Sequence, residues 1–196
     1  VLMIGGSGLY IDVVCEGIDS IPKTSKNIRD SINLKFEKKG IEWLNSEVKR
    51  IDPLFYNNVD KRNAQRLKRC IEVFETTGKQ ISSFHNKARK KRNFEIIKIG
   101  ISTDREKLYK KINERVDLMI KNGLIKEAKS LLKYRDQNAL NTVGYKELFN
   151  YFDKNYSKEF AINEIKKNTR RFAKRQITWF RRDKKIKWFV LSLIHI

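Results

Sequence analysis

The stretch KRQITWFRR, residues 174–182, lies in a helical pattern that begins near Phe160. Ile165, Phe172 and Trp179 recur every seven residues. Because seven residues are close to two turns of an α-helix, this spacing predicts that the three apolar side chains share one face. We therefore expect a long helix that packs against the rest of the molecule through this face.

A second face of the same helix is cationic. No acidic residue separates Glu164 from Asp183, so nothing within that part of the helix neutralises this face. An ordinary basic helix is simply a solvated amphipathic surface, but uncompensated charge repels itself in the free protein, which favours a polyanionic partner here. The basic residues are Lys167, Arg170, Arg171, Lys174, Arg175, Arg181 and Arg182.

The composition extends this argument to the whole chain. Its 196 residues contain 44 Lys and Arg against 23 Asp and Glu, a formal net charge of +21, and the basic residues are spread along the chain. This length allows one core with a small appendage. A surface of this charge suits phosphate contacts, although charge alone does not separate RNA, DNA and anionic membrane.

Other features bear on the cellular location. No apolar run approaches the length that crosses a bilayer, and no signal peptide is visible, so no membrane partner is expected. Cys15 and Cys70 are isolated and have no metal-site spacing, which indicates reduced thiols in a cytoplasmic protein. The start at Val1, in place of Met, indicates a fragment.

The N-terminal residues predict a glycine turn before a helix. Residues 1–4 are apolar and predict a buried strand, residues 5–8 (Gly-Gly-Ser-Gly) predict a tight turn, and Ser7 lies at the expected helix start. Glycines let the backbone approach a phosphate, and a helix N-terminus favours an anion. Such turns are also common without a ligand. No Gly-Lys-Ser/Thr follows, so this is not a Walker A loop.

Residues 25–91 predict a helical insert with almost no strand signal. Asp52-Pro53 ends its first long helix, since the residue before a proline is pushed out of the α region. The buried stripe of that helix is expected to be Ile41, Leu44, Val48 and Ile51.

A second helix of the insert is predicted to have Asp60 as its N-cap and to end at Gly78. Its arginines lie away from its apolar stripe, and they form either a cationic ridge for a ligand or a surface for solubility. The apolar residues are Ala64, Leu67, Ile71 and Phe74, and the arginines are Arg62, Arg66 and Arg69.

Residues 94–101 return to a β-rich pattern, which indicates re-entry into a sheet, and residues 187–190 predict a last strand. Between them, Asp104 is expected to cap a long helix that stops at Gly123. The apolar face of this helix is Leu108, Ile112, Val116 and Met119.

Arg115 lies on the flank of that apolar face. Burying an unpaired guanidinium costs free energy, so a side chain this near the core needs a partner. The partner is either a local acid, reached by a snorkelling side chain, or an anion such as a phosphate that is bound bidentately.

Residues 141–146 (Asn-Thr-Val-Gly-Tyr-Lys) form a predicted turn after a helix over 124–134. The turn either contacts nucleic acid by stacking and phosphate contacts, or is an ordinary interhelical turn with Tyr145 packed inside. No Ser/His/Asp set, metal cluster or catalytic carboxylate pair can be assembled, and His85 and His195 are isolated. The residues alone predict an α/β core with a helical insert and cationic faces suited to RNA.

Taken together, these motifs resemble those of the tRNA dimethylallyltransferases, also called isopentenyl-tRNA transferases, of the IPP transferase family. They occur in the order of that family from Val1 to about Val190. The matching segments are residues 5–10, 60–79, 115–119 with 123–124, 142–148, 169–171 and 174–181.

The resemblance implies a P-loop-NTPase-like α/β core with an inserted all-helical domain. The core is expected at residues 1–24 and 92–196, partial because its N-terminal strand and P-loop are missing, and the insert at 25–91. The implied reaction transfers a dimethylallyl group from dimethylallyl diphosphate to N6 of the adenine 3′-adjacent to the anticodon, with the target base flipped out of the stack.

The same resemblance implies partners and a cofactor. The partners are tRNA, through its anticodon stem-loop, and dimethylallyl diphosphate. The cofactor is Mg²⁺, with its ligands expected in the missing N-terminal segment. A monomer is expected.

The functional residues of the family match positions of this chain one by one. Arg115 matches the arginine that binds the diphosphate of the donor. Ser7 stands where the family usually has Thr, near the target nucleotide, and both residues are expected in the catalytic site. The expected tRNA contacts are Ser7, Arg29, Gln65, Arg66, Leu67, Lys68, Arg69, Asn141, Thr142, Val143, Gly144, Tyr145, Lys146, Lys174, Arg175, Gln176, Ile177, Thr178, Trp179, Phe180 and Arg181.

The Walker A loop and the catalytic Asp of the family both lie upstream of Gly5, and this chain contains neither. We therefore expect the fragment to bind tRNA without prenylating it. Two alternatives remain: an adenylate isopentenyltransferase, and a non-catalytic basic RNA-binding remnant. The first lacks the long tRNA-binding insert, so Arg29 and residues 65–69 argue against it.

Overall fold

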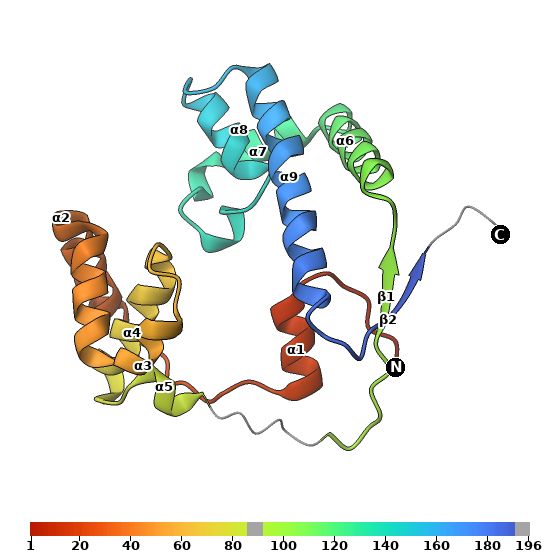
Figure 1. The fold of residues 1–196 in the computed structure, drawn as a ribbon. Helices are drawn as coiled ribbons and strands as arrows, with labels where there is room; N and C mark the ends of the chain where they lie inside the picture. Colours follow the sequence, from red (N-terminus) through yellow and green to blue (C-terminus); the bar gives the residue numbers. More distant parts are fainter. Residues whose placement is uncertain (86–91, 191–196) are drawn as a thin grey trace. The chain divides into compact units, whose positions relative to one another are not determined.

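A computed structural model of the chain describes residues 1–85 and 92–190. They form two compact units, and both are drawn as ribbons in Figure 1. Unit 1 combines Val1–Ile11 with Phe94–Ile196, and unit 2 is Asp12–Asn93. The described part of the chain is rich in helix and contains a small parallel sheet of two strands.

The predicted helical insert, 25–91, lies within unit 2 as far as residue 85. Its last residues, 86–91, and the C-terminal residues 191–196 lie outside the described part of the chain. The boundaries expected for the insert and the core stay a prediction. Helix α1, Gly8–Glu16, crosses the division between the two units.

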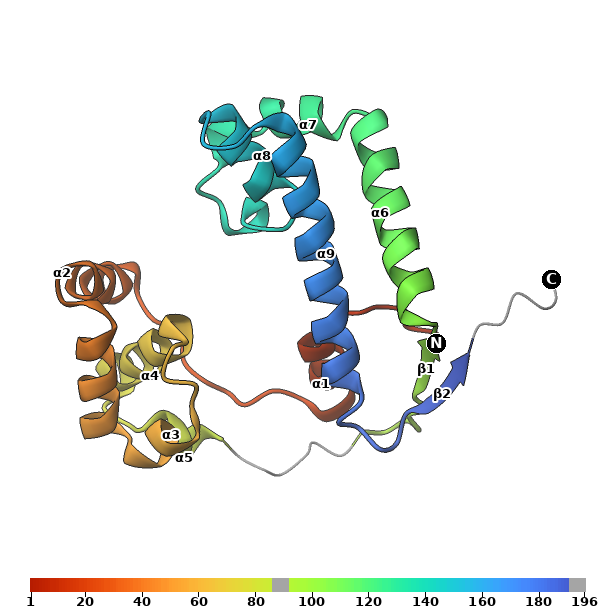
Figure 2. The same ribbon diagram turned by 45° about the horizontal axis from the view of Figure 1, so that its top comes forward.

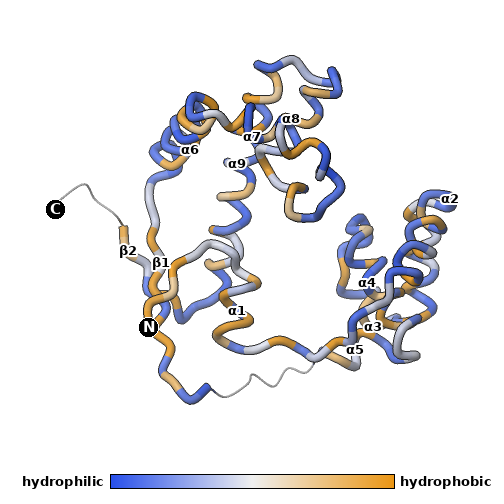
Figure 3. The backbone as a smooth tube through the Cα atoms, turned by 180° about the vertical axis from the view of Figure 1, so that it is seen from behind, coloured by the Kyte–Doolittle hydropathy of each residue, from blue (hydrophilic) through white to orange (hydrophobic). Residues whose placement is uncertain are grey.

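Unit 2 is a set of helices around one apolar core. The predicted buried stripe is confirmed, because Leu44, Val48 and Ile51 are buried and Ile41 is half-buried against them. Figure 3 shows apolar and polar residues interspersed along these helices, as amphipathic packing requires. The helices are α2 Lys26–Ile51, α3 Pro53–Asn58, α4 Ala64–Thr77 and α5 Ile81–Phe84.

Asp52 ends α2, as predicted, and it also joins three segments of unit 2. Its side chain is wholly buried. The carboxylate accepts hydrogen bonds from the Phe55 backbone N (2.9 Å), the Ser82 backbone N (2.8 Å) and the Ser82 hydroxyl (3.0 Å). The buried charge is therefore hydrogen-bonded on both oxygens, which is the condition under which such burial is tolerated.

The second helix of the insert begins later than predicted. Asn63 is the N-cap of α4, and its side chain accepts from the Arg66 backbone N. Asp60 instead accepts from the Arg62 backbone N (3.0 Å) in the turn that precedes the helix. The predicted end is confirmed, because Gly78 adopts the left-handed conformation (φ 68°) that glycine tolerates.

Unit 1 contains the sheet and the remaining helices. Strand β1, Ile99–Ser102, pairs in parallel with β2, Lys187–Val190, with Ile99 opposite Lys187. The helices of the long crossover between the strands follow in the order α6 Arg105–Lys121, α7 Leu124–Ser130, η1 Leu132–Tyr134, η2 Asn138–Leu140, α8 Tyr145–Phe152 and α9 Lys158–Phe180.

The second core lies where these helices meet. Its buried residues come from α6, α7, α8 and α9, and include Val116, Leu124, Leu148 and Ile165. Figures 1 and 2 both show α6 alongside α9, and the two helices are in contact. The predicted Asp104 cap is confirmed, because this carboxylate accepts from the Glu106 and Lys107 backbone N.

The strand predicted at residues 1–4 is wrong. These residues have no regular structure and are exposed, with Leu2 at 84%. The β-rich run at 94–101 becomes a strand only from Ile99. A strand needs a hydrogen-bonding neighbour, and in the described residues β2 pairs only with 99–102.

The apolar face predicted for α9 is wrong at Phe172. Ile165 is buried, but Phe172 is 44% exposed. The buried core that α6, α7, α8 and α9 share includes Ile165 of α9, and Phe172, two turns later, is not part of it. The guanidinium of Arg175 lies over that ring, 5.7 Å from its centroid.

Apolar side chains remain exposed on both strands of the sheet, among them Ile101 (63%) and Phe189 (56%). Among the described residues, none of the helices combines the length and apolar character of a membrane span.

Candidate nucleic-acid interface

The glycine turn at residues 5–8 lies directly against α9. The Gln176 side-chain amide donates a hydrogen bond to the Gly6 backbone O (2.9 Å). A Cβ on Gly6 would lie 2.4 Å from Gln176 Nε2, and a Cβ on Gly8 would lie 2.3 Å from Trp179 Cδ1. Side chains of α9 therefore occupy the space of a Cβ at both glycines, neither of which has a positive φ. The rigid ring of Trp179 excludes a Cβ at Gly8, whereas the flexible end of Gln176 can move away from one at Gly6.

This contact brings together two sets of predicted site residues. Ser7 is exposed and immediately precedes α1, where its backbone O accepts from the Ile11 N (3.1 Å). The end of α9 supplies Gln176 and Trp179 beside it. The hydroxyl of Ser7 thus lies at a helix N-terminus, next to the C-terminal turns of the cationic helix.

The cations of α9 divide into two groups. In the N-terminal half, Lys166 pairs with Asp117 (2.6 Å), Arg170 donates to Asn113 Oδ1 (2.7 Å), and Lys167 pairs with Glu164. These groups hold α9 to α6 or to itself. The exposed cations of the C-terminal half are Arg171, Lys174, Arg175 and, just after the helix, Arg181 and Arg182.

Within the predicted contact segment 174–181, the side chains differ in their exposure to solvent. Lys174, Arg175, Thr178 and Arg181 are exposed, and the remaining side chains are half-buried. The half-buried ones are Gln176, Ile177, Trp179 and Phe180.

Arg115 does not have the environment that the sequence predicted. Its side chain is exposed, so the argument from burial is wrong. Asn113 and Asp117 face α9, and Arg115, two positions from each, lies about 200° around the helix from them. No hydrogen bond or ion pair holds Arg115 in the described residues, so its guanidinium is open to a ligand on the side of α6 away from α9.

In unit 2, the run 65–69 combines exposed and fixed side chains. Gln65 and Arg66 are exposed, whereas Leu67 is wholly buried in the core, so the Leu67 side chain cannot make the predicted tRNA contact. Lys68 donates to Asn33 Oδ1 (2.9 Å). Helical periodicity explains the difference, because one position in each turn of α4 must face α2.

Glu72 joins two arginines of the predicted tRNA surface. Arg69 donates to Glu72 Oε2 (3.2 Å) and to the Thr24 hydroxyl (3.0 Å), and Arg29 Nε lies 3.8 Å from the same Glu72 oxygen. Sequence reasoning missed Glu72 and Thr24 in this role. The three-residue spacing of Arg69 and Glu72 on one helix was a signal for their pairing, but nothing in the sequence pointed to Thr24.

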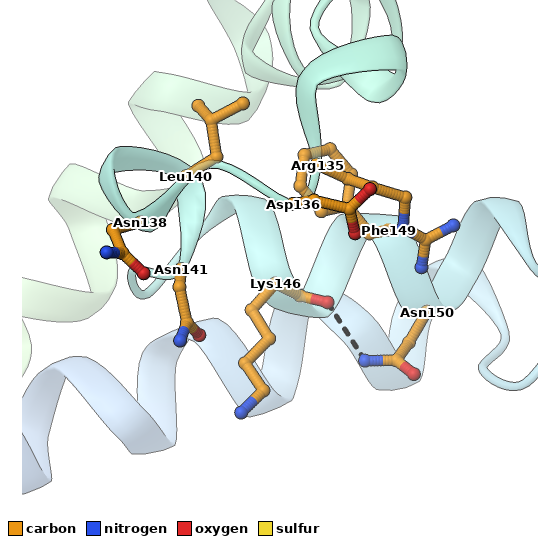
Figure 4. Close-up of a pocket in the computed structure, with 8 residues that line it drawn as sticks. All are labelled: Arg135, Asp136, Asn138, Leu140, Asn141, Lys146, Phe149 and Asn150. Carbon is orange, nitrogen blue, oxygen red and sulfur yellow. Dashed lines mark hydrogen bonds between the residues drawn. The ribbon is translucent and has the colours of Figure 1, made fainter. Parts of the chain in front are cut away.

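The turn at 141–146 forms one wall of a cavity of about 310 Å³. Figure 4 shows its side chains and the hydrogen bond from Asn150 Nδ2 to the Lys146 backbone O (2.9 Å). Asn141, Thr142 and Lys146 are exposed, whereas Val143 is half-buried and Gly144 is buried. The cavity is lined by Arg135, Asp136, Asn138, Leu140, Asn141, Lys146, Phe149 and Asn150.

In the free protein, the side chain of Tyr145 packs between helices. Its hydroxyl donates to Glu127 Oε1 (2.5 Å), which raises the pKa of Tyr145, and its ring stacks on Phe149 with centroids 6.3 Å apart. Of the two readings of this turn, the structure supports the interhelical one for Tyr145. The exposed neighbours of Tyr145 remain available to a ligand.

Arg135 is a cation of this cavity that sequence reasoning missed. Its guanidinium binds Asp153 bidentately (2.9 and 2.6 Å), which lowers the pKa of Asp153. It also lies over the Phe149 ring, 5.6 Å from the centroid.

Comparison with known proteins places these features in a family. The model of a family described as IPP transferase matches residues 1–183. The tRNA dimethylallyltransferase of Christiangramia forsetii is 54% identical over 188 residues, which cover 96% of this chain and 62% of that protein. The corresponding protein of Flavobacterium johnsoniae is 48% identical, with 98% of this chain and 64% of that protein covered.

Solved structures agree with this comparison. The tRNA isopentenylpyrophosphate transferase of Bacillus halodurans is 32% identical, with a TM-score of 0.57, over 96% of this chain and 59% of its own. A eukaryotic dimethylallyltransferase acting on tRNA has a TM-score of 0.68 over 97% of this chain and 51% of its own, and at 21% identity it shows the fold alone. The chain spans about three fifths of the length of the curated relatives.

Proposed function

This chain belongs to the IPP transferase family, and from that membership we propose that the whole protein is a tRNA dimethylallyltransferase. It transfers a dimethylallyl group from dimethylallyl diphosphate to N6 of the adenine 3′-adjacent to the anticodon. The relatives that carry this name align with nearly the whole of the chain, which supports the proposal. The units correspond in this proposal to part of a P-loop-type α/β core and to an inserted helical domain.

One observation of this structure carries the proposal furthest. Gln176 and Trp179 hold the glycine turn against α9, so the exposed Ser7 lies at the C-terminal turns of the helix, which also carry the exposed cations Lys174 and Arg175. An RNA strand that binds these cations through its phosphates would bring a nucleotide to the Ser7 hydroxyl. Chemistry on a stacked base requires that base to leave the stack, and a hydroxyl at a helix N-terminus is a suitable polar contact for it.

Unit 2 contributes a second RNA contact in this proposal. Arg29 and Arg69 are oriented by the shared Glu72, and Gln65 and Arg66 are exposed on the same helix as Arg69. Guanidinium groups bind backbone phosphates without reading sequence, so this surface would supply affinity and register.

Arg115 is proposed to bind the diphosphate of the prenyl donor. Its support is its match to the family, together with the finding that its guanidinium is exposed and not paired within the described residues. A free guanidinium binds diphosphate oxygens bidentately and stabilises the negative charge of a departing pyrophosphate.

Mg²⁺ is proposed as the cofactor of the whole protein. In the described ranges, no group of three or more His, Cys, Asp or Glu side chains could hold a metal ion. The role of this chain is to bind tRNA, to present Ser7 and to hold the diphosphate.

The test is a complementation experiment with the complete open reading frame that encodes this chain. A bacterial strain without its own tRNA dimethylallyltransferase is transformed, and its tRNA nucleosides are measured by mass spectrometry. Dimethylallylated adenosine next to the anticodon is the expected product. Its absence, together with retained tRNA binding by the purified protein, would instead indicate an RNA-binding protein without this activity.

A further inference from the structure

Glu147 is a buried carboxylate that the proposed reaction does not use. Its side chain is only 5% exposed and lies in the first turn of α8. Its Oε2 accepts from the Gly144 backbone N (2.8 Å), and its Oε1 accepts from the Asn168 side-chain amide (2.7 Å). Each carboxylate oxygen therefore accepts a hydrogen bond, one from the turn at 141–144 and one from α9.

The Gly144 bond fixes an unusual backbone conformation. Gly144 has φ 107° and ψ −61°, a region that other residues rarely adopt, and it is itself buried. The exposed Asn141 and Thr142 lie just before it and the exposed Lys146 lies just after it. The direction in which these three side chains leave the protein therefore depends on how Gly144 is held.

Helix capping explains only half of this arrangement. A Glu at the third position of a helix often accepts from the N-cap backbone N, and there it also meets the positive end of the helix dipole. Such a residue usually remains in water. Glu147 is buried without an ion pair among the described residues, which is costly unless its hydrogen bonds are complete. The second bond, to Asn168, ties the turn to the helix that carries Lys174 and Gln176.

We propose that Glu147 is a positioning residue for RNA: through Gly144 and Asn168 it holds the turn 141–146 in register with α9, so that Asn141, Thr142 and Lys146 meet the same RNA strand as Lys174. The inference rests on the proposed function, because it assigns to that function a residue that does not itself touch the RNA. Glu147 acts through the backbone of its neighbour.

The test compares Glu147→Ala with Glu147→Gln. In Glu147→Gln, the amide oxygen accepts from the Gly144 N, and the amide nitrogen donates to Asn168 once the Asn168 amide has turned over. In Glu147→Ala, the Gly144 N and the Asn168 amide both lose their partner. We expect Glu147→Ala to weaken binding of an anticodon stem-loop RNA about tenfold, and Glu147→Gln to bind within about twofold of wild type.

Leu148→Ala is the matched control. Leu148 is the next residue of α8, wholly buried in the same core, so its truncation destabilises the unit and leaves the Gly144 hydrogen bond in place. At a temperature where all variants are folded, Leu148→Ala is expected to bind RNA like the wild type. Equal losses of affinity in Leu148→Ala and Glu147→Ala would reduce Glu147 to a stability residue and overturn the inference.

Two further measurements separate positioning from stability. Glu147→Ala should lower the salt dependence of RNA binding, since one phosphate contact, that of Lys146, is lost; the slope falls by about 0.7 to 0.9. Exchange of the Gly144 amide proton should be faster in Glu147→Ala than in Leu148→Ala, because only the former loses the acceptor.

The outcomes distinguish the inference from the function on which it rests. A wild-type chain that does not bind the stem-loop RNA contradicts the proposed function and the inference together. A wild-type chain that binds, with Glu147→Ala binding equally well at an unchanged salt slope, contradicts the inference alone.

Discussion

The side-chain amide of Gln176 donates a hydrogen bond to the backbone O of Gly6 at 2.9 Å, across 170 positions of the sequence. Trp179, one helical turn later, covers Gly8 so closely that a Cβ there would lie 2.3 Å from its ring. These two contacts make the glycine turn and the end of α9 one surface. They also account for the glycines at positions 6 and 8, neither of which has a positive φ.

Gly8→Ala tests this surface. The added Cβ meets Trp179 Cδ1 at 2.3 Å, so Trp179 must move, and we expect a loss of about 1–3 kcal/mol in the free energy of unfolding together with weaker RNA binding. Gly5→Ala is the matched control, because nothing lies within 4 Å of a Cβ at Gly5. Thermal unfolding and fluorescence anisotropy on both variants check the prediction; equal effects at Gly5 and Gly8 would contradict it.

Lys174→Ala and Arg115→Ala should affect different ligands. Lys174 is exposed on the proposed RNA surface, so its loss should weaken tRNA binding severalfold and lower the salt slope by about 0.7 to 0.9. Arg115 lies on the side of α6 away from α9, so Arg115→Ala should leave tRNA affinity nearly unchanged. In the whole protein, the same change should raise the KM for dimethylallyl diphosphate. A tRNA affinity that falls equally in both variants would contradict the assignment of Lys174 and Arg115 to different ligands.

Asp52→Ala should destabilise unit 2. The carboxylate accepts three hydrogen bonds in a fully buried site, so its loss removes an N-cap and leaves the Ser82 N and hydroxyl without a partner. We expect a loss of about 2–4 kcal/mol in the free energy of unfolding. Asp60→Ala is the control, since Asp60 is exposed and accepts one bond in a turn; its effect in urea unfolding should be under about 1 kcal/mol.

The ion pair of Asp183 with Lys98 predicts a specific acid dependence. The hydrogen bond from Lys98 (2.6 Å) and that from the Lys185 backbone N lower the pKa of Asp183 in the folded protein. A depressed folded pKa means that the stabilisation is complete above the unfolded value, about 3.9, and is lost as the pH falls through the folded pKa.

The comparison is therefore between wild type and Asp183→Asn over a range of pH. The difference in free energy of unfolding should be on the order of 1 kcal/mol above about pH 5 and should shrink below about pH 4. A difference that grew on acidification would have the wrong sign for this ion pair.

Cys70 should be inert towards alkylation in the folded protein. Burial, and then the negative charge of Asp52, raises the pKa of its thiol to about 12, and the thiolate is the reactive form. At pH 8, iodoacetamide should modify Cys70 only after unfolding, as mass spectrometry of peptides would show. Modification of native protein at a rate independent of denaturant would contradict a buried, protonated thiol.

Several local features were predictable because their causes are local. Asp104 caps α6, Asp52-Pro53 ends α2, and Gly78 ends α4, since each depends on hydrogen bonds and dihedral angles within a few residues. The elements that pack against these helices lie far away in the sequence, so local signals did not predict them. The prediction of Asp60 as the N-cap of α4 was wrong for a different reason. Whether Asp60 or Asn63 begins the helix depends on the turn between them, which signals from single residues do not describe.

The sequence by itself determined the family, the order of the long helices, and the cationic character of α9, because motif order, apolar periodicity and charge are properties of the chain alone. Only the tertiary structure decided which of these residues are free. Periodicity predicts which residues share a face of a helix, but not which element packs against that face. The exposure of Phe172 and Arg115 and the burial of Leu67 therefore follow from where α6, α8 and α2 pack. In the same way, the glycines at 5–8 showed where a backbone could be approached closely, and the folded chain showed that Gln176 and Trp179 make that approach.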